Sequence, residues 1–406
     1  MAGLTTGLRT FVAERLLERN PLSQKLFGRE AERLARACAD MASRFQDGGR
    51  LLAFGRGAAA TDAQHVAVEF VHPVIVGKRA LPALDLSASF HRWVPAIARD
   101  ADIVMGFSDP AGDEMVSAAL ASARTLGACT FALPGPLGDF ALDPPSADPF
   151  VSQELIEVLY HTLWETVHVF FEHGVVGSTR HATVPSKNER PQDAGPSAFL
   201  YPFLGTDRQD TSTIVTDVAA SIRAKAADDE RLRIEVACHQ ADRIAEAVEA
   251  VGRRLEAGGV LLMFGNGGSA TDATDWTIDC VSPPLGLPVI RALSLANEPA
   301  NITAIANDIG TEAIFLRQLI AHGRRGDVAI AISTSGGSAN VIAALEEARK
   351  RDMLTVALLG YDGGEIVRRG LVDIPIVVHC DYIPRIQEVQ ASIYHVMTEA
   401  WRQCRS

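Results

Sequence analysis

The strongest constraint on the fold is an internal repeat. Residues 258–273 read GGVLLMFGNGGSATDA, and residues 48–63, 210 positions earlier, read GGRLLAFGRGAAATDA. In each copy a short apolar run ends at a glycine-rich turn, and residues suited to a helix start follow. A buried strand, a tight turn and a helix N-terminus bring free backbone N–H groups and the positive end of the helix dipole together. The repeat therefore predicts two copies of one unit, each with a place for an anionic or hydroxylated ligand.

The length of the chain fits two domains, because 406 residues exceed one ordinary hydrophobic core. We expect a first domain over residues 1–173 and a second over 211–406. Residues 174–210 lose all periodicity and contain four prolines, so they are predicted to form a linker. The matched strands that begin at residues 102 and 327 are 225 positions apart, compared with 210 for the glycine turns. The first half is therefore shorter in this region, and it has no counterpart to residues 301–310.

Apolar strand-like runs alternate with helical patterns in both halves, and this predicts parallel βαβ units. The fold class we expect is α/β, with two tandem three-layer α/β/α sandwiches that have flavodoxin-like parallel sheets. The predicted strands are 51–54, 83–86, 102–107, 129–133, 260–264, 289–294, 327–333, 354–359 and 374–378. Residues 134–149 are predicted to be a loop, followed by a long helix over 152–172.

Composition excludes several classes of protein. The formal net charge of −12 argues against nucleic-acid binding, which needs a basic surface. No apolar run approaches the roughly 20 residues that span a bilayer, and residues 1–20 lack a signal-peptide core. We therefore expect a cytoplasmic protein without a membrane partner, whose six scattered cysteines are reduced thiols.

The strongest chemical signal is Ile332–Ser338, which reads ISTSGGS between a predicted strand and a predicted helix. The hydroxyls of Ser333, Thr334, Ser335 and Ser338 and the glycine-exposed N–H groups would form a phosphate cradle at a helix N-terminus. The alternative is that Ser and Thr only cap the helix. Four hydroxyls in six positions exceed the needs of a cap.

Four motifs together resemble the sugar isomerase (SIS) domain and, within it, the phosphoheptose isomerases. They are GNGGS at 265–269, NDIG at 307–310, ISTSGGSANV at 332–341 and RIQE at 385–388. The resemblance covers residues 211–406 closely and residues 1–173 in a degenerate form. It implies interconversion of sedoheptulose 7-phosphate and a heptose 7-phosphate, without a nucleotide cofactor. The substrate-binding residues that it implies are Asn266, Gly267, Gly268, Ser269, Asn307, Asp308, Ser333, Thr334, Ser335, Ser338 and Gln387.

In the family a glutamate and a histidine act as acid and base, and in some members they bind zinc with a second histidine and a glutamine. In the second half these positions hold Asp279, His395, Asp275 and Gln387, so the glutamate and the second histidine are both replaced by aspartate. The first half keeps all four types, as Glu69, His161, His65 and Gln153. The resemblance thus implies a zinc site there, the alternative being leftover ancestry or a polar cluster.

The first half has lost the ligand loops. SDPAGD at 108–113 stands where the second half has STSGGS, and RGAA at 56–59 replaces NGGS. Two carboxylates at that place would repel a phosphate, so we do not expect the first half to bind a phosphosugar by itself.

These observations lead to a hypothesis of complementation. The second half would hold phosphate and sugar, while catalytic or metal groups come partly from the first, in an enediol proton transfer. Since sites in the family lie near subunit interfaces of tetramers, we expect a homodimer that forms a pseudo-tetramer of SIS domains. The alternative function is non-catalytic binding of a phosphosugar by a regulatory or scaffold protein, which the two aspartates favour.

Overall fold

The described residues of the computed structural model, 2–73, 78–172, 211–284 and 287–403, form two five-stranded parallel sheets. The strand order is β2-β1-β3-β4-β5 in the first sheet and β7-β6-β8-β9-β10 in the second. The two orders correspond strand for strand, so the predicted duplication of a parallel α/β fold is confirmed. The strands are β1 (Leu51–Phe54), β2 (Ala83–Asp85), β3 (Ile103–Phe107), β4 (Cys129–Leu133), β5 (Phe140–Ala141), β6 (Leu261–Phe264), β7 (Ala292–Ser294), β8 (Val328–Ser333), β9 (Leu354–Leu359) and β10 (Ile374–Val377).

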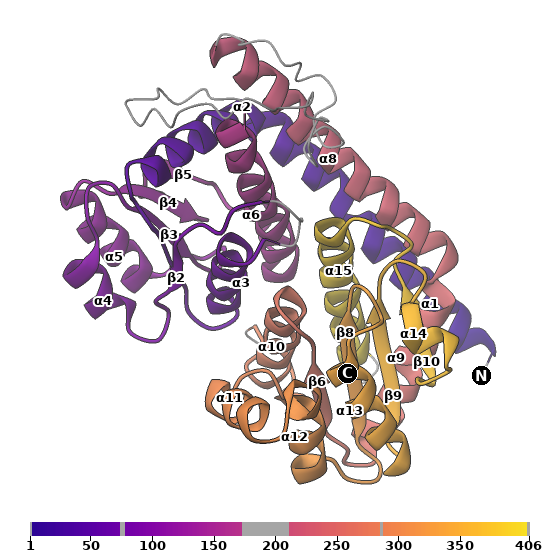
Figure 1. Cartoon of the computed structure of the whole chain (residues 1–406). Coiled ribbons are helices and arrows are strands. Elements are labelled where there is room, and N and C mark those ends of the chain that lie inside the picture. Colours follow the sequence, from indigo (N-terminus) through magenta and orange to yellow (C-terminus); the bar gives the residue numbers. More distant parts are fainter. Residues whose placement is uncertain (1, 74–77, 173–210, 285–286, 404–406) are drawn as a thin grey trace, which may run out of the picture.

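Helices cover both faces of each sheet (Figure 1). Those of the first half are α1 (Ala2–Leu17), α2 (Arg19–Gln46), α3 (Ala59–Val71), α4 (Phe90–Ile97), α5 (Glu114–Thr125) and α6 (Pro149–Glu172). Those of the second half are α8 (Thr211–His239), α9 (Ala241–Glu256), α10 (Gly268–Val281), α11 (Pro299–Asp308), α12 (Ile314–His322), α13 (Ala339–Lys350), α14 (Gly364–Arg368) and α15 (Ile383–Gln403).

The strands are apolar throughout because both of their faces are buried. In β1, Leu51 and Ala53 join the core formed with α2, α3 and α6, whereas Leu52 and Phe54 join the core formed with α4 and α5. The second sheet is packed in the same way, with one core under α9, α10 and α15 and another under α12 and α13. Alternate side chains of one strand therefore serve two cores, as a three-layer sandwich requires.

The two halves exchange helices. Val12 and Leu16 of α1 are buried in a core of the second half, and Ile214 and Val218 of α8 are buried in a core of the first half. The long helices α2 and α8 lie side by side across the molecule (Figure 1). As a result, the predicted ranges 1–173 and 211–406 do not each enclose a separate core. The predicted linker, residues 174–210, lies outside the described residues.

Helices α3 and α6 of the first half meet α10 and α15 of the second half between the two sheets (Figure 1). Most of the predicted acid, base and metal-binding residues lie on these helices, so the interface between the halves positions the candidate site.

Two local features differ from or extend the prediction. The short strand β5 lies inside the expected loop, and only Phe140 and Ala141 pair with β4, which is too short a segment to show periodicity. Helix α11 lies in the segment expected to have no counterpart in the first half. Within the described part of the chain, no helix combines the length and apolar character needed to cross a bilayer.

Candidate active site

The glycine turn of the second half (residues 265–269) joins β6 to α10. Gly267 has a φ of +56°, a backbone region that favours glycine, and Ser269 is buried in the first turn of α10. The side-chain amides of Asn266 and Asn340 exchange two hydrogen bonds, with N···O distances of 2.9 and 2.8 Å. Since Asn340 begins α13, these bonds hold the glycine turn beside the helix that follows residues 333–338.

The phosphate loop (residues 333–338) joins β8 to α13. Ser333 Oγ accepts a hydrogen bond from the Gly336 N–H at 3.2 Å, and Ser335 Oγ accepts one from the Gly337 N–H at 3.3 Å. Ser338 occupies the N-cap position of α13, but its side chain makes no capping hydrogen bond. The capping alternative therefore leaves the Ser338 hydroxyl unexplained, whereas an anion at this helix N-terminus would use it.

Asn307 and Asp308, also predicted to bind the substrate, have no described contact with the glycine turn or the phosphate loop. Both are exposed at the end of α11, and the Asn307 side chain donates to Asp308 Oδ1 at 2.8 Å. No described contact joins them to the phosphate loop.

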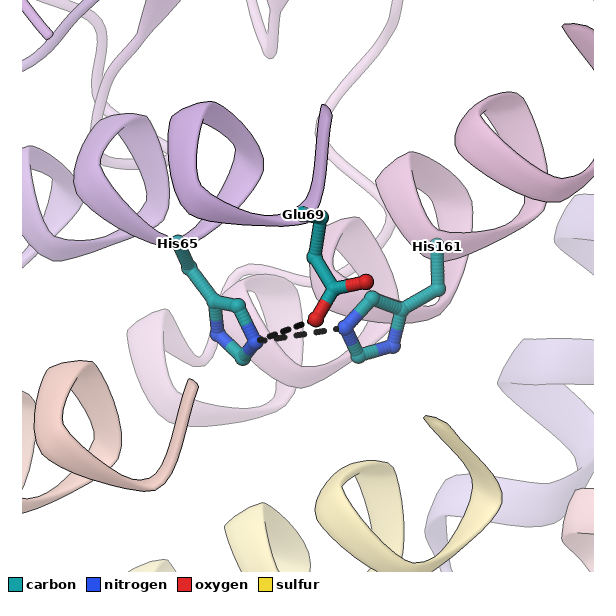
Figure 2. A group of neighbouring side chains, drawn as sticks. All are labelled: His65, Glu69 and His161. Carbon is teal, nitrogen blue, oxygen red and sulfur yellow. Dashed lines mark hydrogen bonds and ion pairs between the residues drawn. The ribbon is translucent and has the colours of Figure 1, made fainter. Parts of the chain in front are cut away.

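Three predicted zinc ligands of the first half come together, and we call them the first cluster (Figure 2). His65 and Glu69 lie one turn apart on α3, and both point toward His161 on α6. His65 Nε2 lies 3.4 Å from His161 Nε2 and 3.9 Å from Glu69 Oε1. All three side chains are at most 2% exposed.

The second half completes the first cluster through the adjacent residues Gln387 and Glu388 of α15. The Gln387 side-chain amide lies 3.4 Å from His65 Nε2. Glu388 pairs through Oε2 with Arg385 at 2.8 Å, and its Oε1 lies 2.9 Å from His161 Nδ1. We therefore assign the His161 proton to Nδ1, donated to Glu388, which leaves the lone pair of Nε2 toward His65.

Burial makes both histidines of the first cluster neutral. Desolvation lowers the pKa of His65 to about 3 and outweighs the opposing effect of Asp275. Desolvation, with His65 and Arg385 nearby, also holds the pKa of His161 well below its usual range. The pKa of Glu69 is raised to about 8, first by desolvation and then by the negative charge of Glu165. Neutral imidazoles are the form that binds metals or accepts protons.

The first cluster fits zinc by its donors and their spacing. Two imidazoles, a carboxylate and an amide are available, and Glu69 Oε2 and Gln387 Oε1 are buried without a hydrogen-bond partner in the part of the chain that the structure describes. Ligands about 2.0–2.1 Å from a tetrahedral ion lie roughly 3.3–3.4 Å from each other. The separation of 3.4 Å between the two imidazole nitrogens matches that edge.

The corresponding residues of the other half form the second cluster, Asp275 and Asp279 on α10 with His395 on α15. His395 Nε2 lies 3.2 Å from Asp279 Oδ2 and 3.6 Å from Asp275 Oδ2, while Nδ1 lies 3.0 Å from Glu154 Oε1. Desolvation lowers the pKa of His395, but hydrogen bonds to these three carboxylates outweigh it and raise the pKa well above its usual value. The second cluster is therefore an imidazolium surrounded by carboxylates, which does not suit metal binding.

Gln153 does not join His65, Glu69 and His161, as the sequence had suggested. Its side-chain amide donates to Asp275 Oδ1 at 2.9 Å and to Asp62 Oδ2 at 3.2 Å, and Gln387 takes its place beside His65. The reason is helix geometry, because eight residues of α-helix separate Gln153 and His161 by about 12 Å, too far for one ion. The pair Gln153-Glu154 of α6 thus contacts the second cluster, and the pair Gln387-Glu388 of α15 contacts the first cluster. The repeated Gln-Glu pair was visible in the sequence, although the two glutamates were not predicted as site residues.

A pocket of about 400 Å³ shows how the loops and clusters combine. It is lined by the degenerate loops of the first half, including Gly57, Ala58 and Asp109, and by Asp279 of the second half. Asp279 therefore faces the degenerate loops, and the buried His395 pairs with it at 3.2 Å.

The first cluster, in turn, lies against the intact glycine turn of the second half. A Cβ on Gly268 would lie 2.4 Å from His65 Nε2 and 2.0 Å from Gln387 Nε2, so both side chains would have to move to admit any other residue. The equivalent position in the first half is Ala58. Each set of loops is thus completed by the helix pair of the opposite half.

The degenerate loops hold carboxylates in place of hydroxyls. Asp113 caps α5 by accepting from the N–H groups of Met115 and Val116, and it pairs with Arg56 at 2.9 Å. Burial, followed by the charge of Asp113, raises the pKa of Asp109. Pro110 also removes a backbone N–H that the equivalent Ser335 supplies.

Comparison with known proteins places these features in a family. The family model described as "SIS domain" matches residues 227–360. A phosphoheptose isomerase of Geobacter sulfurreducens is 40% identical over 190 residues, which are 46% of this chain and 96% of that protein. One of Citrifermentans bemidjiense is 42% identical over 157 residues, 38% of this chain and 81% of its own length.

A solved structure resembles the whole chain in fold. The C-terminal domain of glucosamine-fructose-6-phosphate aminotransferase from Francisella tularensis aligns with a TM-score of 0.59, covering 97% of this chain and 95% of that domain. The identity is 9%, so this likeness concerns the fold alone. Through the second half, where the sequence identity, the glycine turn and the phosphate loop coincide, the chain belongs to the phosphoheptose isomerase family of SIS-domain proteins.

Proposed function

We propose that the chain is an aldose–ketose isomerase of a phosphorylated sugar, with sedoheptulose 7-phosphate as the preferred substrate. One composite site per chain would carry the reaction. The observation that supports it most directly is the close approach of His65 and Gln387 to Gly268, because it joins the first cluster to the intact loops.

Substrate binding would fall to the second half. The hydroxyls and N–H groups of the phosphate loop, at the N-terminus of α13, suit a phosphate dianion. Asn266 and Ser269 of the glycine turn would bind the sugar hydroxyls. These groups fix the distance between the phosphate and the reacting carbons, which selects for chain length.

Proton transfer would fall to the first cluster. Isomerisation takes a proton from the carbon beside the carbonyl, forms an enediol and returns a proton to the neighbouring carbon, while the oxygens exchange a proton. Glu69 in its ionised form would take the carbon-bound proton, and neutral His161 can accept and return the oxygen-bound proton. Glu388 would stabilise the imidazolium that His161 forms, because it lies 2.9 Å from Nδ1.

Zinc is part of the proposal. His65, Glu69, His161 and Gln387 would hold it. Because zinc would take the Nε2 lone pair of His161, His161 would move the oxygen-bound proton only in the zinc-free site, and bound zinc would instead polarise the carbonyl oxygen of the sugar. Asp272 would orient His65, since its Oδ1 lies 3.6 Å from Nδ1.

The test is a direct assay of the full chain with sedoheptulose 7-phosphate, after chelation and again with added zinc. We expect turnover that zinc increases, and a product identified by chromatography as an aldoheptose 7-phosphate. Tight binding of the sugar phosphate without turnover in either condition would instead favour a regulatory or scaffold protein. Asp279, one of the two aspartates that favoured that alternative, lines the pocket of the degenerate loops and not the composite site.

A further inference from the structure

A small cavity at the centre of the interface gathers four carboxylates from both halves. We call it the acidic cavity. Its volume is about 10 Å³, room for one water-sized sphere. It is lined by the carboxylates of Asp62, Glu157, Asp272 and Asp275 and by the rings of Tyr160 and Tyr394, among others.

Two of the four carboxylates have ample hydrogen-bond partners. Asp275 accepts from Thr61 at 3.0 Å, from Gln153 at 2.9 Å and from the Tyr394 hydroxyl at 2.8 Å. Asp62 shares the amide of Gln153 at 3.2 Å. These contacts leave no need for a further ligand at Asp275.

The other two carboxylates are not satisfied. Asp272 Oδ2 and Glu157 Oε1 have no hydrogen-bond partner among the described residues, although the two residues are only 2% and 4% exposed. Both residues line the acidic cavity, and no lysine or arginine is among its described lining residues. A carboxylate oxygen of each, with a nitrogen of His65, lies within 4.8 Å of the other two. Burying an unpaired carboxylate costs several kcal/mol, so each of the two must either hold a proton or meet a cation, and two oxygens that face one cavity can share a single cation.

We propose that the acidic cavity binds one hard divalent cation, Mg²⁺ or Mn²⁺, through Asp272 and Glu157, with Asp62 beside them. Carboxylate oxygens are the ligands these ions prefer, and a cavity of this size suits their short metal–oxygen distances of about 2.0–2.1 Å. Asp272 comes from α10, whereas Glu157 and Asp62 come from α6 and α3, so the cation joins the two halves. The inference does not depend on the proposed isomerase activity.

The repeat predicts one such site and not two. Aligning Tyr160-His161 with Tyr394-His395 places Ala391 opposite Glu157. The site related to the acidic cavity by the repeat would have Ala391 in place of Glu157. It would therefore lack one of the two carboxylates on which the proposed cation site depends.

The test measures bound metal and thermal stability of the full chain after chelation and dialysis. With Mn²⁺ we expect about one equivalent per chain by electron paramagnetic resonance and elemental analysis. Saturating Mg²⁺ or Mn²⁺ should raise the midpoint of thermal unfolding by about 4 °C. Glu157→Gln, which preserves shape, should lose both effects, as should Asp272→Asn.

Two control variants distinguish binding in the acidic cavity from binding at the degenerate pocket or at the first cluster. Asp109→Asn removes an acidic group from the degenerate pocket and should keep both the bound Mn²⁺ and the stability shift. His161→Gln removes a ligand of the first cluster and should also keep them. The proposal is overturned if the wild type binds no Mn²⁺ above background, if Glu157→Gln binds it like the wild type, or if His161→Gln abolishes binding.

Discussion

The composite site around the phosphate loop and the degenerate pocket around Asp109 are built on the same backbone pattern and differ in nearly every chemical group. One combines hydroxyl-rich loops with neutral histidines and a glutamate. The other combines carboxylates and a proline with an imidazolium held by two aspartates. Each site draws its loops from one half and its acid–base groups from the other. The loops lost in the first half and the glutamate and histidine replaced in the second half therefore belong to the same site, the degenerate pocket. A fused duplication can therefore keep one complete site while changing both copies.

The largest expected difference between the two sites follows from removing the equivalent carboxylate from each. Glu69→Gln should lower kcat about 1000-fold, since general acid–base groups contribute roughly 10²–10⁴-fold. Asp279→Asn, the matched change at the degenerate pocket, should leave kcat within about threefold of wild type. Steady-state assays with sedoheptulose 7-phosphate measure both, and an equal loss in the two variants would contradict the composite site.

A second change transfers one feature of the degenerate loop to the intact one. Thr334→Asp places a carboxylate where the phosphate is expected, as Asp109 does in the first half. Repulsion should raise KM about 100-fold, equivalent to roughly 2.7 kcal/mol of binding free energy. The reciprocal Asp109→Thr should change KM less than about twofold. Unchanged KM in Thr334→Asp would mean that the phosphate binds elsewhere.

A third change, with no expected effect on catalysis, tests the second cluster as an ion pair. The pKa of His395 is higher in the folded protein than in the unfolded chain, so its stabilisation is complete below the unfolded pKa of about 6.5. It is lost as pH rises through the folded pKa. His395→Gln should therefore reduce the free energy of unfolding most at pH 6, by about 3 kcal/mol, and less at pH 9.

Denaturant unfolding at several pH values measures that difference. Asp109→Asn, outside the second cluster, serves as the control and should show no such trend. A stability deficit that grows with pH would show that His395 is not held as an imidazolium.

The sequence was enough to predict both sheets and the residue types of the site, because the two halves share one pattern of apolar strands and glycine turns. It led to the hypothesis that the first half supplies acid–base or metal groups to the loops of the second half, but it did not predict that Gln387 lies beside His65 in place of Gln153. Spacing within one half made Gln153 and His161 look like partners, but spacing along a helix does not tell which of two opposed helices a side chain meets. Similarly, the apolar stripe of α1, with Val12 and Leu16, identifies a buried face but not the core that buries it.

The exchanged helices also constrain the order in which the molecule can be completed during synthesis. The core of the first half includes Ile214, Val218 and Ile222, so it cannot be finished until the ribosome has passed well beyond residues 1–173. Helix α1 packs on α15, and Arg15 of α1 and Arg19 of α2 both pair with Glu399 of α15. Helix α1 must therefore wait for a helix made 384 residues later, and neither half is expected to be recovered as a stable fragment.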